Sequence, residues 1–200
     1  MFLILCGKCG CGKNAIAEKL YDKGFEPIVS HTTRPMREGE INSIDYFFVE
    51  KDTFLKMIEN DSFIEYRTYN TLVNGVEDTW YYGISKDSFH RTSDYAVILD
   101  MNGTRDFKKY IEESFGKNSC FVCYIDVDEP TRRQRAQGRG SFDACEWDRR
   151  VKADEEDFNE SILEELCDTR VTNDSKLDSC VNLVIRRFNK HKDKALGDSL

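Results

Sequence analysis

The chain has 200 residues, of which 40% are hydrophobic and 33% charged, and its formal net charge is -8. This length is typical of one globular domain with a substantial core, so we treat 1–200 as a single domain. The acidic balance argues against a nucleic-acid-binding protein, because such proteins use a basic surface to displace counterions from phosphates.

The first apolar run, Phe2–Leu5, predicts a buried strand, and a glycine-rich segment follows it. The segment has the spacing Gly-x4-Gly-Lys and precedes a helical pattern at 15–20, which is typical of a phosphate-binding loop for ATP. Its residues are Gly7, Lys8, Cys9, Gly10, Cys11, Gly12, Lys13 and Asn14. Backbone N–H groups at the start of a helix attract a phosphate, and Lys13 would add a point charge. The alternative is a glycine-rich turn with an incidental lysine.

Asn14 occupies the position at which this pattern normally carries Ser or Thr, whose hydroxyl binds Mg²⁺. An amide oxygen can also bind a hard cation, but the side chain is longer and Mg²⁺ requires nearly octahedral geometry. We therefore expect Asn14 to weaken the affinity for the metal or to slow turnover.

Eight cysteines raise the question of disulfides or a zinc site. Cys6, Cys9 and Cys11 lie in or beside the phosphate loop, where a metal would take the place of the ligand. Cys120 and Cys123 lie in an apolar run whose alternation puts them on opposite faces of a strand. Neither group has four-ligand spacing, so reduced and mostly buried thiols are expected. The N-terminal apolar run is too short for a signal peptide and no stretch reaches membrane-spanning length, which favours a cytoplasmic protein with no membrane partner.

The remaining patterns predict strands that alternate with helices. Strands are expected at 24–30, 45–49, 63–67, 95–100, 121–127 and 170–172. Helices are expected at 53–59 with Asp52 as its cap, and at 103–114, 130–137, 145–166 and 177–188. The segment 68–79 is interpreted as a polar loop with a hairpin turn at Asn74-Gly75, and the charged tail from Asn189 is expected to fray.

Strands and helices that alternate behind a phosphate loop predict an α/β fold, with a parallel sheet flanked by helices on both faces. In such folds, ligands bind at the carboxyl ends of the strands. The segment 31–90 breaks the alternation with hairpin-like strands, so we interpret it as an α+β insert.

Five short motifs then follow one another along the chain: Ser30-His31-Thr32-Thr33-Arg34-Pro35-x-Arg37-x-Gly39-Glu40, Asp45-Tyr46-x-Phe48-Val49, Phe63-Ile64-Glu65-Tyr66, Tyr81-Tyr82-Gly83, and Gly138-Arg139-Gly140 with Arg150 after it. Each is weak alone, but the ordered set resembles the guanylate kinase family over nearly the whole chain. The resemblance implies a P-loop nucleoside monophosphate kinase that uses ATP, GMP or dGMP, and Mg²⁺. It implies a core (1–30, 91–134 and 153–190), a monophosphate-binding insert (31–90) and an arginine-rich lid (135–152). Monomer and homodimer both stay open.

Seven positions match the family's GMP site: Ser30, Arg34, Arg37, Tyr46, Glu65, Tyr82 and Asp100. The resemblance implies that the arginines and tyrosine hydroxyls hold the monophosphate, a task suited to forked guanidinium groups. Glu65 would read guanine, because its two oxygens can face the N1–H and N2–H₂ donors of that base. Ser30 would lie near guanine O6, and Asp100 near the metal and the acceptor. As alternatives, Glu65 could face water and Asp100 could cap the helix that follows it.

Four positions match the family's catalytic cations: Lys13, Arg135, Arg139 and Arg150. The resemblance implies that they neutralise charge on the transferred phosphoryl group. Asn173 resembles the position that contacts the adenine of ATP, and Asn14 with Asp100 would hold Mg²⁺. The neighbouring Arg132, Arg133 and Arg149 are interpreted as a solvated helix face.

Some positions depart from the family pattern. Lys8 replaces a proline, Ile84 replaces a Ser or Thr near the guanine oxygen, and the segment 68–79 is longer than usual. Two alternatives therefore stay open. One is a kinase for another (deoxy)nucleoside monophosphate or a sugar phosphate. The other is a catalytically silent module that binds a phosphorylated peptide through Arg34, Arg37 and Tyr46.

Overall fold

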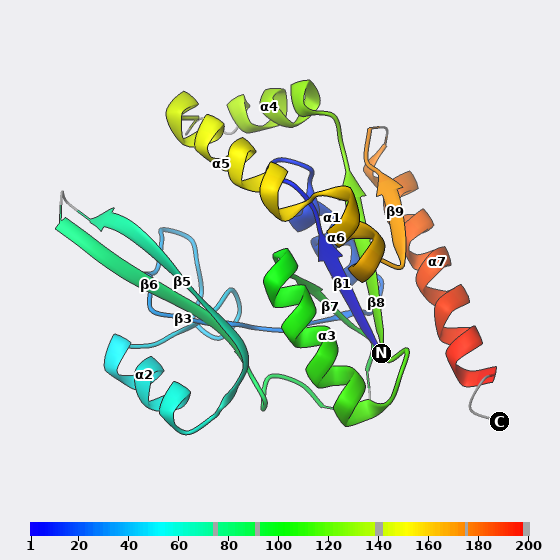
Figure 1. The fold of residues 1–200 in the computed structure, drawn as a ribbon, viewed down its shortest axis with the longest axis horizontal. Helices are drawn as coiled ribbons and strands as arrows, with labels where there is room; N and C mark the ends of the chain where they lie inside the picture. Colours follow the sequence, from blue (N-terminus) through cyan, green and yellow to red (C-terminus); the bar gives the residue numbers. More distant parts are fainter. Residues whose placement is uncertain (74–75, 91–92, 139–141, 175, 198–200) are drawn as a thin grey trace. The chain divides into compact units, whose positions relative to one another are not determined.

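The buried strand at the start of the chain lies at the centre of the first of two units. The computed structural model describes residues 1–73, 76–90, 93–138, 142–174 and 176–197 (Figure 1). Met1–Glu26 and Ser93–Leu200 form one unit, called the core unit below, and Pro27–Thr92 form the other, called the insert unit.

Within the described residues, the core unit contains a five-stranded sheet in the order β2-β7-β1-β8-β9. These strands are β1 (Phe2–Cys6), β2 (Glu26–Pro27), β7 (Tyr95–Ile98), β8 (Cys120–Asp126) and β9 (Thr169–Thr172). β1 pairs in parallel with β7 and β8, and β8 pairs in parallel with β9. Every residue of β1 is buried, as expected for a strand covered on both faces. The predicted α/β fold with a parallel sheet is confirmed.

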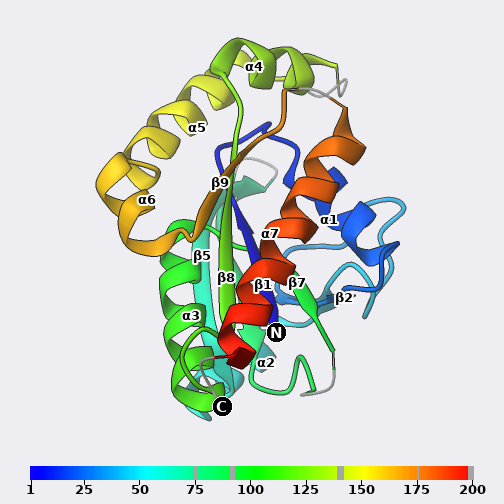
Figure 2. The same cartoon turned by 90° about the vertical axis from the view of Figure 1, so that its right-hand side faces the viewer.

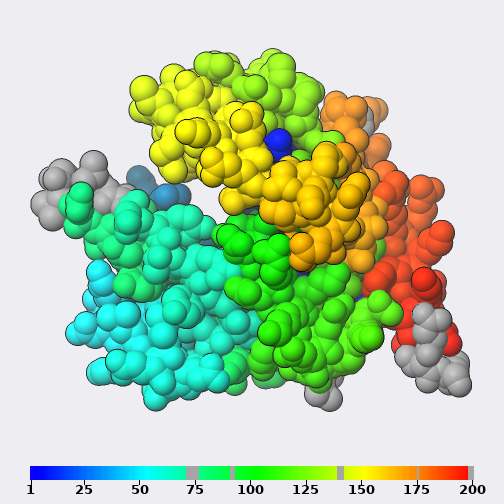
Figure 3. All heavy atoms as spheres, in the orientation of Figure 1, coloured from blue at the N-terminus to red at the C-terminus, as the bar shows by residue number. Residues whose placement is uncertain are grey.

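Helices cover both faces of this sheet. The helices of the core unit that the structure describes are α1 (Lys13–Tyr21), α3 (Met101–Phe115), α4 (Glu129–Gln137), α5 (Ala144–Asp157), α6 (Glu160–Leu166) and α7 (Leu177–Gly197). α1 packs with α7 and α3 packs with α6, and Figure 2 shows the two pairs on opposite sides of the sheet. On the face drawn in Figure 3, only a small blue area of the N-terminal segment reaches the surface.

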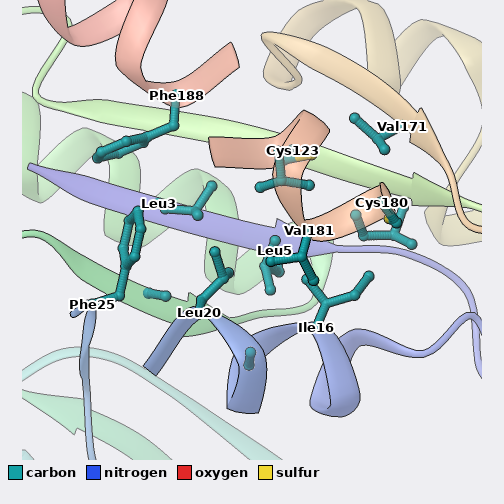
Figure 4. Packing of buried hydrophobic residues seen from close by; sticks show 14 of the residues in the cluster. Leu3, Leu5, Ile16, Leu20, Phe25, Cys123, Val171, Cys180, Val181 and Phe188 are labelled. Atoms are coloured by element: carbon teal, nitrogen blue, oxygen red, sulfur yellow. The ribbon is translucent and has the colours of Figure 1, made fainter. Parts of the chain in front are cut away.

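The main hydrophobic core lies between β1, α1 and α7 (Figure 4). Leu3 and Leu5 of β1 pack with side chains of both helices, and all are almost completely buried. Phe25 lies edge-on to Phe188 of α7, with 5.1 Å between ring centroids. Burial of one such side chain contributes about 1.5–3 kcal/mol. This core therefore fixes the strand and the helix on either side of the glycine-rich segment.

The insert unit contains a second sheet, with strand order β4-β3-β6-β5 in the described residues. Its elements are β3 (His31–Thr32), β4 (Phe47–Phe48), α2 (Lys51–Glu59), β5 (Phe63–Val73) and β6 (Val76–Ser85). Phe54 of α2 is fully buried and stacks on Phe63 of β5, with 4.4 Å between ring centroids. This aromatic contact attaches the helix to the sheet.

The predicted polar loop at 68–79 was wrong. β5 and β6 pair in antiparallel register from Thr68↔Tyr81 to Val73↔Val76, and Figure 1 shows the two strands side by side. Exposed polar residues such as Thr68, Asn70 and Glu77 fit a strand as well as a loop, because a strand with exposed side chains does not need an apolar face. The predicted turn residues 74–75 lie outside the described residues.

Several predicted element ends need correction. The strands predicted at 24–30 and 45–49 are reduced to Glu26–Pro27 and Phe47–Phe48. Asp52 does not cap α2, because the helix begins at Lys51, two residues before the predicted start, and Glu50 takes the cap position. Asp52 lies in the first turn instead, where a carboxylate favours the helix dipole.

The long helix predicted at 145–166 is two helices. α5 ends at Asp157, and Asn159 starts α6 by accepting a hydrogen bond from the backbone N–H of Ile162 at 3.1 Å. The tail predicted to fray from Asn189 is helical to Gly197. Its turns are held by Lys192, whose Nζ lies 2.6 Å from a carboxylate oxygen of Asp94, and by His191, which contacts Asn118 and Phe121. Among the described residues, no helix is long and apolar enough to cross a membrane.

Candidate active site

The glycine-rich segment forms a tight loop between β1 and α1. Gly12 caps α1 with φ 96° and ψ 19°, and its carbonyl accepts the first helical hydrogen bond from Ile16 at 3.1 Å. A Cβ at Gly12 would lie 2.7 Å from Asn173 Nδ2, and one at Gly10 would lie 2.8 Å from the Arg132 carbonyl. Positive φ angles and these close approaches both require glycine. The turn followed by a helix N-terminus is the arrangement predicted for a phosphate-binding loop.

The ammonium group of Lys13 lies against this loop. Its Nζ donates to the carbonyl of Gly7 at 2.5 Å and to that of Lys8 at 3.3 Å. Cys11 Sγ lies 3.7 Å from the same nitrogen, and burial raises the pKa of that thiol. The Lys13 side chain therefore lies next to the loop, where an anion would bind.

The sequence predicts that Arg132 lies on a solvated helix face, and this prediction was wrong. Arg132 is only 4% exposed, and it donates to the carbonyls of Cys9 at 3.0 Å and Val127 at 3.2 Å. Asp154 of α5 lies 3.4 Å from the same guanidinium and accepts the backbone N–H of Cys9 at 2.7 Å. Burial raises the pKa of Asp154, although both contacts favour its charged form. One buried ion pair thus holds both backbone groups of Cys9.

Arg135 and Asn173 hold the next part of the loop. The amide of Asn173 donates to the carbonyl of Cys11 at 2.9 Å, and Arg135 donates to the carbonyls of Cys11 at 3.4 Å and Asn173 at 2.8 Å. Asn173 is 4% exposed, and it joins the loop to the segment after β9. Both predicted residues therefore lie at the phosphate loop. Their contacts with the phosphates and adenine of ATP stay predictions.

Arg150 also lies close to the loop, with Nη1 3.8 Å from Cys9 Sγ. Its Nε donates to Glu146 at 2.7 Å, and Arg149 forms a second ion pair with the same carboxylate. The two arginines, Arg149 first, lower the pKa of Glu146 to about 2. Arg149 and Arg133 are exposed, as predicted for a solvated face. Arg139 lies outside the described residues.

The two predicted magnesium ligands lie on different helices of the core unit. Asn14 is exposed in the first turn of α1. Asp100 caps α3, because its Oδ1 accepts the backbone N–H of Gly103 at 2.6 Å. The alternative prediction, that Asp100 caps the helix after it, is therefore confirmed. The donor set, one amide oxygen and one carboxylate, consists of the oxygen ligands that Mg²⁺ prefers, so it is compatible with this ion.

In the insert unit, Arg34 is buried and held by Glu40. Its two terminal nitrogens donate to the two carboxylate oxygens at 3.0 and 2.7 Å, and Nη1 also donates to the Pro35 carbonyl. Glu40 raises the pKa of Arg34, and Arg34 in turn lowers the pKa of Glu40. A bidentate pair of this kind fixes the plane of the guanidinium group.

The two predicted tyrosines lie next to Arg34. Its guanidinium lies 5.5 Å from the ring centroid of Tyr46, and the rings of Tyr46 and Tyr82 are 6.0 Å apart. Burial raises the pKa of Tyr46, so its hydroxyl stays protonated as a donor. Arg37 is exposed, and its backbone N–H donates to Glu40 at 2.7 Å. Four of the seven residues predicted to bind GMP thus lie close to one another, around the ion pair of Arg34 with Glu40.

Glu65 does not face water, the alternative that the sequence left open. It lies on β5 with 8% exposure, and its carboxylate is 3.9 Å from Arg67 Nη1. Ile84, opposite Glu65 in the β5–β6 register, is completely buried. Ser30 is half-buried directly before β3, and its carbonyl accepts the N–H of Phe47 at 2.9 Å. A buried carboxylate is costly unless it has polar partners, and Arg67 is one such partner of Glu65.

A family model for guanylate kinase matches residues 1–189. The chain belongs to the guanylate kinase family. Membership of this family supports a nucleoside monophosphate kinase.

Solved structures of two kinases share the fold. A guanylate kinase from Anaplasma phagocytophilum is similar with a TM-score of 0.61 and 20% identity, over 97% of this chain and 85% of the other. A gluconokinase from Sinorhizobium meliloti 1021 has a TM-score of 0.54 and 13% identity, over 99% of this chain and 97% of the other. At these identities the likeness concerns the fold alone.

Sequence reasoning missed three residues that position the candidate site. The motif that contains Glu40 does not indicate the ion pair of this residue with Arg34. The sequence around Arg132 predicts a solvated helix face, and Asp154 is one of several acids at 154–157. No pattern in the sequence separates Asp154 from its neighbours. Its role depends on a contact with Cys9, which lies 145 positions earlier.

Proposed function

We propose that this chain is an ATP-dependent guanylate kinase, which transfers the γ-phosphoryl group of ATP to GMP or dGMP and releases ADP with GDP or dGDP. Family membership supports the class of reaction. The observation that carries the choice of acceptor is the buried carboxylate of Glu65. Its two oxygens can accept from N1–H and N2–H₂ of guanine, a pair of adjacent donors that adenine lacks.

In this proposal, the loop N–H groups and Lys13 bind the phosphates of ATP. Arg135, Arg139 and Arg150 neutralise the charge that spreads over the phosphoryl group as it moves between oxygens. The hydrogen bonds of Arg135 to the loop and the ion pair of Arg150 with Glu146 support this role, because groups that are already oriented need not reorganise during the reaction. No covalent intermediate with the protein is required.

Arg34, Arg37, Tyr46 and Tyr82 would hold the monophosphate of the acceptor. The bidentate pair with Glu40 supports this assignment for Arg34, because a guanidinium with a fixed plane loses less entropy when it binds a phosphate. The hydroxyls of the two tyrosines would donate to the same phosphate. Ser30 would contact guanine beside Glu65.

Asn14 and Asp100 are the residues that we propose to hold Mg²⁺. When bound, the ion offsets phosphate charge. Asn173 would contact adenine, as the family resemblance implies. A cytoplasmic location and the choice between monomer and homodimer stay predictions.

Replacement of Glu65 tests the guanine assignment. Glu65→Gln keeps the size of the side chain but replaces one acceptor oxygen with an N–H₂ donor. This donor would face one of the two N–H donors of guanine. Loss of a hydrogen bond to a charged group costs about 1.5–3 kcal/mol, so kcat/KM for GMP should fall roughly 10- to 100-fold while KM for ATP stays unchanged. Glu77→Gln, at an exposed position of β6, is the matched control. An unchanged kcat/KM for GMP in Glu65→Gln would contradict the assignment.

A further inference from the structure

Two thiols that are far apart in the sequence lie in contact within the core unit. Cys6 is the last residue of β1 and directly precedes Gly7, and Cys167 lies between α6 and β9. Their sulfur atoms are 3.8 Å apart, which is van der Waals contact. Cys6 is completely buried, whereas Cys167 is partly exposed. A disulfide bond of about 2.05 Å would require the sulfur atoms to approach by less than 2 Å.

The contact is fixed by the strands on both sides. Cys6 lies opposite Tyr124 in the parallel register of β1 and β8. Asp168, the neighbour of Cys167, donates its backbone N–H to Val122 of β8 at 2.9 Å and accepts the N–H of Val122 at 2.7 Å. β8 therefore holds both cysteine-bearing segments in place.

The surroundings give the two thiols different reactivity. The hydrogen bond between them lowers the pKa of Cys167 and raises that of Cys6, which burial also keeps neutral. Burial and the carboxylate of Asp168 act against this lowering at Cys167, whereas Lys108, whose Nζ lies 3.9 Å from Asp168, adds to it. Cys167 is thus the more accessible sulfur and the one with the lowered pKa, and Cys6, in contact with it, is the sulfur that can resolve an oxidised partner.

We propose that Cys6 and Cys167 form an oxidation site, at which a hydroperoxide such as H₂O₂ links the two thiols in a disulfide. The Cys167 thiolate attacks one peroxide oxygen, which gives a sulfenic acid and releases hydroxide. Cys6 sulfur then attacks the sulfenic sulfur, and the sulfenic oxygen leaves as water with the Cys6 proton. In total, two thiols lose two electrons and two protons, and one peroxide becomes two waters.

The disulfide would act on the phosphate loop through Gly7. The backbone there has little free space, since a Cβ at Gly7 would lie 2.6 Å from the carbonyl of Ile125. Lys13 also bonds to the Gly7 carbonyl. A shift of about 1 Å in a positioning group can cost up to about 100-fold in function, so we expect oxidation to weaken ATP binding roughly tenfold. This consequence rests on the proposed function, whereas the oxidation site does not.

Peptide mapping of the full chain tests the site directly. The protein is treated with H₂O₂, remaining thiols are blocked, and trypsin digestion without reductant is followed by mass spectrometry. Cleavage after Lys8, Lys152 and Arg170 isolates Cys6 in residues 1–8 and Cys167 in 153–170, each without another cysteine. We expect the linked pair of these peptides, two hydrogen atoms lighter than their sum, as the main product, and its loss on treatment with dithiothreitol.

Two variants make the result specific. Cys167→Ser should abolish the linked pair, and Cys145→Ser, which removes the exposed cysteine of α5, should leave it unchanged. Main products with Cys9 or Cys11, or sulfinic acid at Cys167 without a link, would overturn the proposal. Because the unsubstituted chain gives the decisive map, the result does not depend on how a variant folds.

Titration of ATP into the reduced and the oxidised chain tests the coupling to the loop. A linked chain that binds ATP as tightly as the reduced one would refute the coupling while the oxidation site stands. A reduced chain that binds no ATP would instead count against the proposed function, whatever the peptide map shows.

Discussion

Cys9 illustrates how side chains from distant segments fix the candidate phosphate loop. Its carbonyl is held by Arg132, 123 positions later, and its N–H by Asp154, 145 positions later. The glycines of the loop could be predicted from the sequence, because their role follows from backbone geometry at adjacent positions. The ion pair of Arg132 with Asp154 could not be predicted, because a charged residue on a helix usually faces water. Only the packed structure shows which charged residue of a helix is buried.

Removal of Asp154 should therefore loosen the core unit. Asp154→Ala leaves the buried Arg132 without its carboxylate and the N–H of Cys9 without its acceptor, which costs about 1–3 kcal/mol. We expect urea unfolding to show a loss of this size in the free energy of unfolding. Glu155→Ala, at the exposed neighbouring position, is the control and should change stability little. Equal effects of the two variants would contradict the role of the buried pair.

Glu40 should make the stability of the chain depend on pH. Arg34 lowers the folded-state pKa of Glu40, so the unfolded state binds more protons as the pH falls. The stabilisation from this pair is present above the unfolded pKa of about 4.3, and it is lost as the pH falls through the lower folded value.

Unfolding curves of the wild type and Glu40→Gln, recorded between neutral and acidic pH, measure this effect. The wild type should be the more stable at neutral pH, and the difference should shrink below about pH 4. A difference that stays constant with pH would show that the pair contributes no charge-dependent stability.

The helices and strands could be predicted mainly where their hydrophobic pattern was strong. Apolar runs predict the buried strands. The helix at 130–137 is predicted from Pro130, which lies near its start. Two of the errors lie where single side chains change the outcome. Asn159 divides a continuous helical pattern into α5 and α6, and contacts with Asp94 and Asn118 extend α7 beyond its apolar stripe. Such contacts are not contained in periodicity.

The cap at Asn159 gives a test at the start of α6. Asn159→Ala removes the acceptor for the N–H of Ile162 and should lower the free energy of unfolding by about 1 kcal/mol. Asn159→Asp should keep most of the stability, because a carboxylate caps as well as an amide. Asn189→Ala, at an exposed position of α7, is the control, and thermal unfolding of all three variants is the measurement. An Asn159→Ala variant as stable as the wild type would exclude a capping role.

The family and the α/β architecture could be predicted for the molecule as a whole, because ordered motifs of several residues carry both. The guanylate kinase family model matches residues 1–189, in agreement with the motifs. The identity of the acceptor could not be derived in the same way. It depends on single positions such as Ile84, which departs from the family pattern and is completely buried beside Glu65.

Initial rates of ADP release from MgATP, measured with GMP, dGMP, AMP, CMP, UMP and dTMP as acceptors, test the proposed activity most directly. We predict turnover with GMP or dGMP and at least about tenfold lower kcat/KM for the other nucleotides, because only guanine offers two adjacent donors to Glu65. Preferred turnover of another acceptor would contradict the assignment of guanine. No turnover with any acceptor, together with measurable binding of GMP, would contradict catalysis and favour a silent binding module.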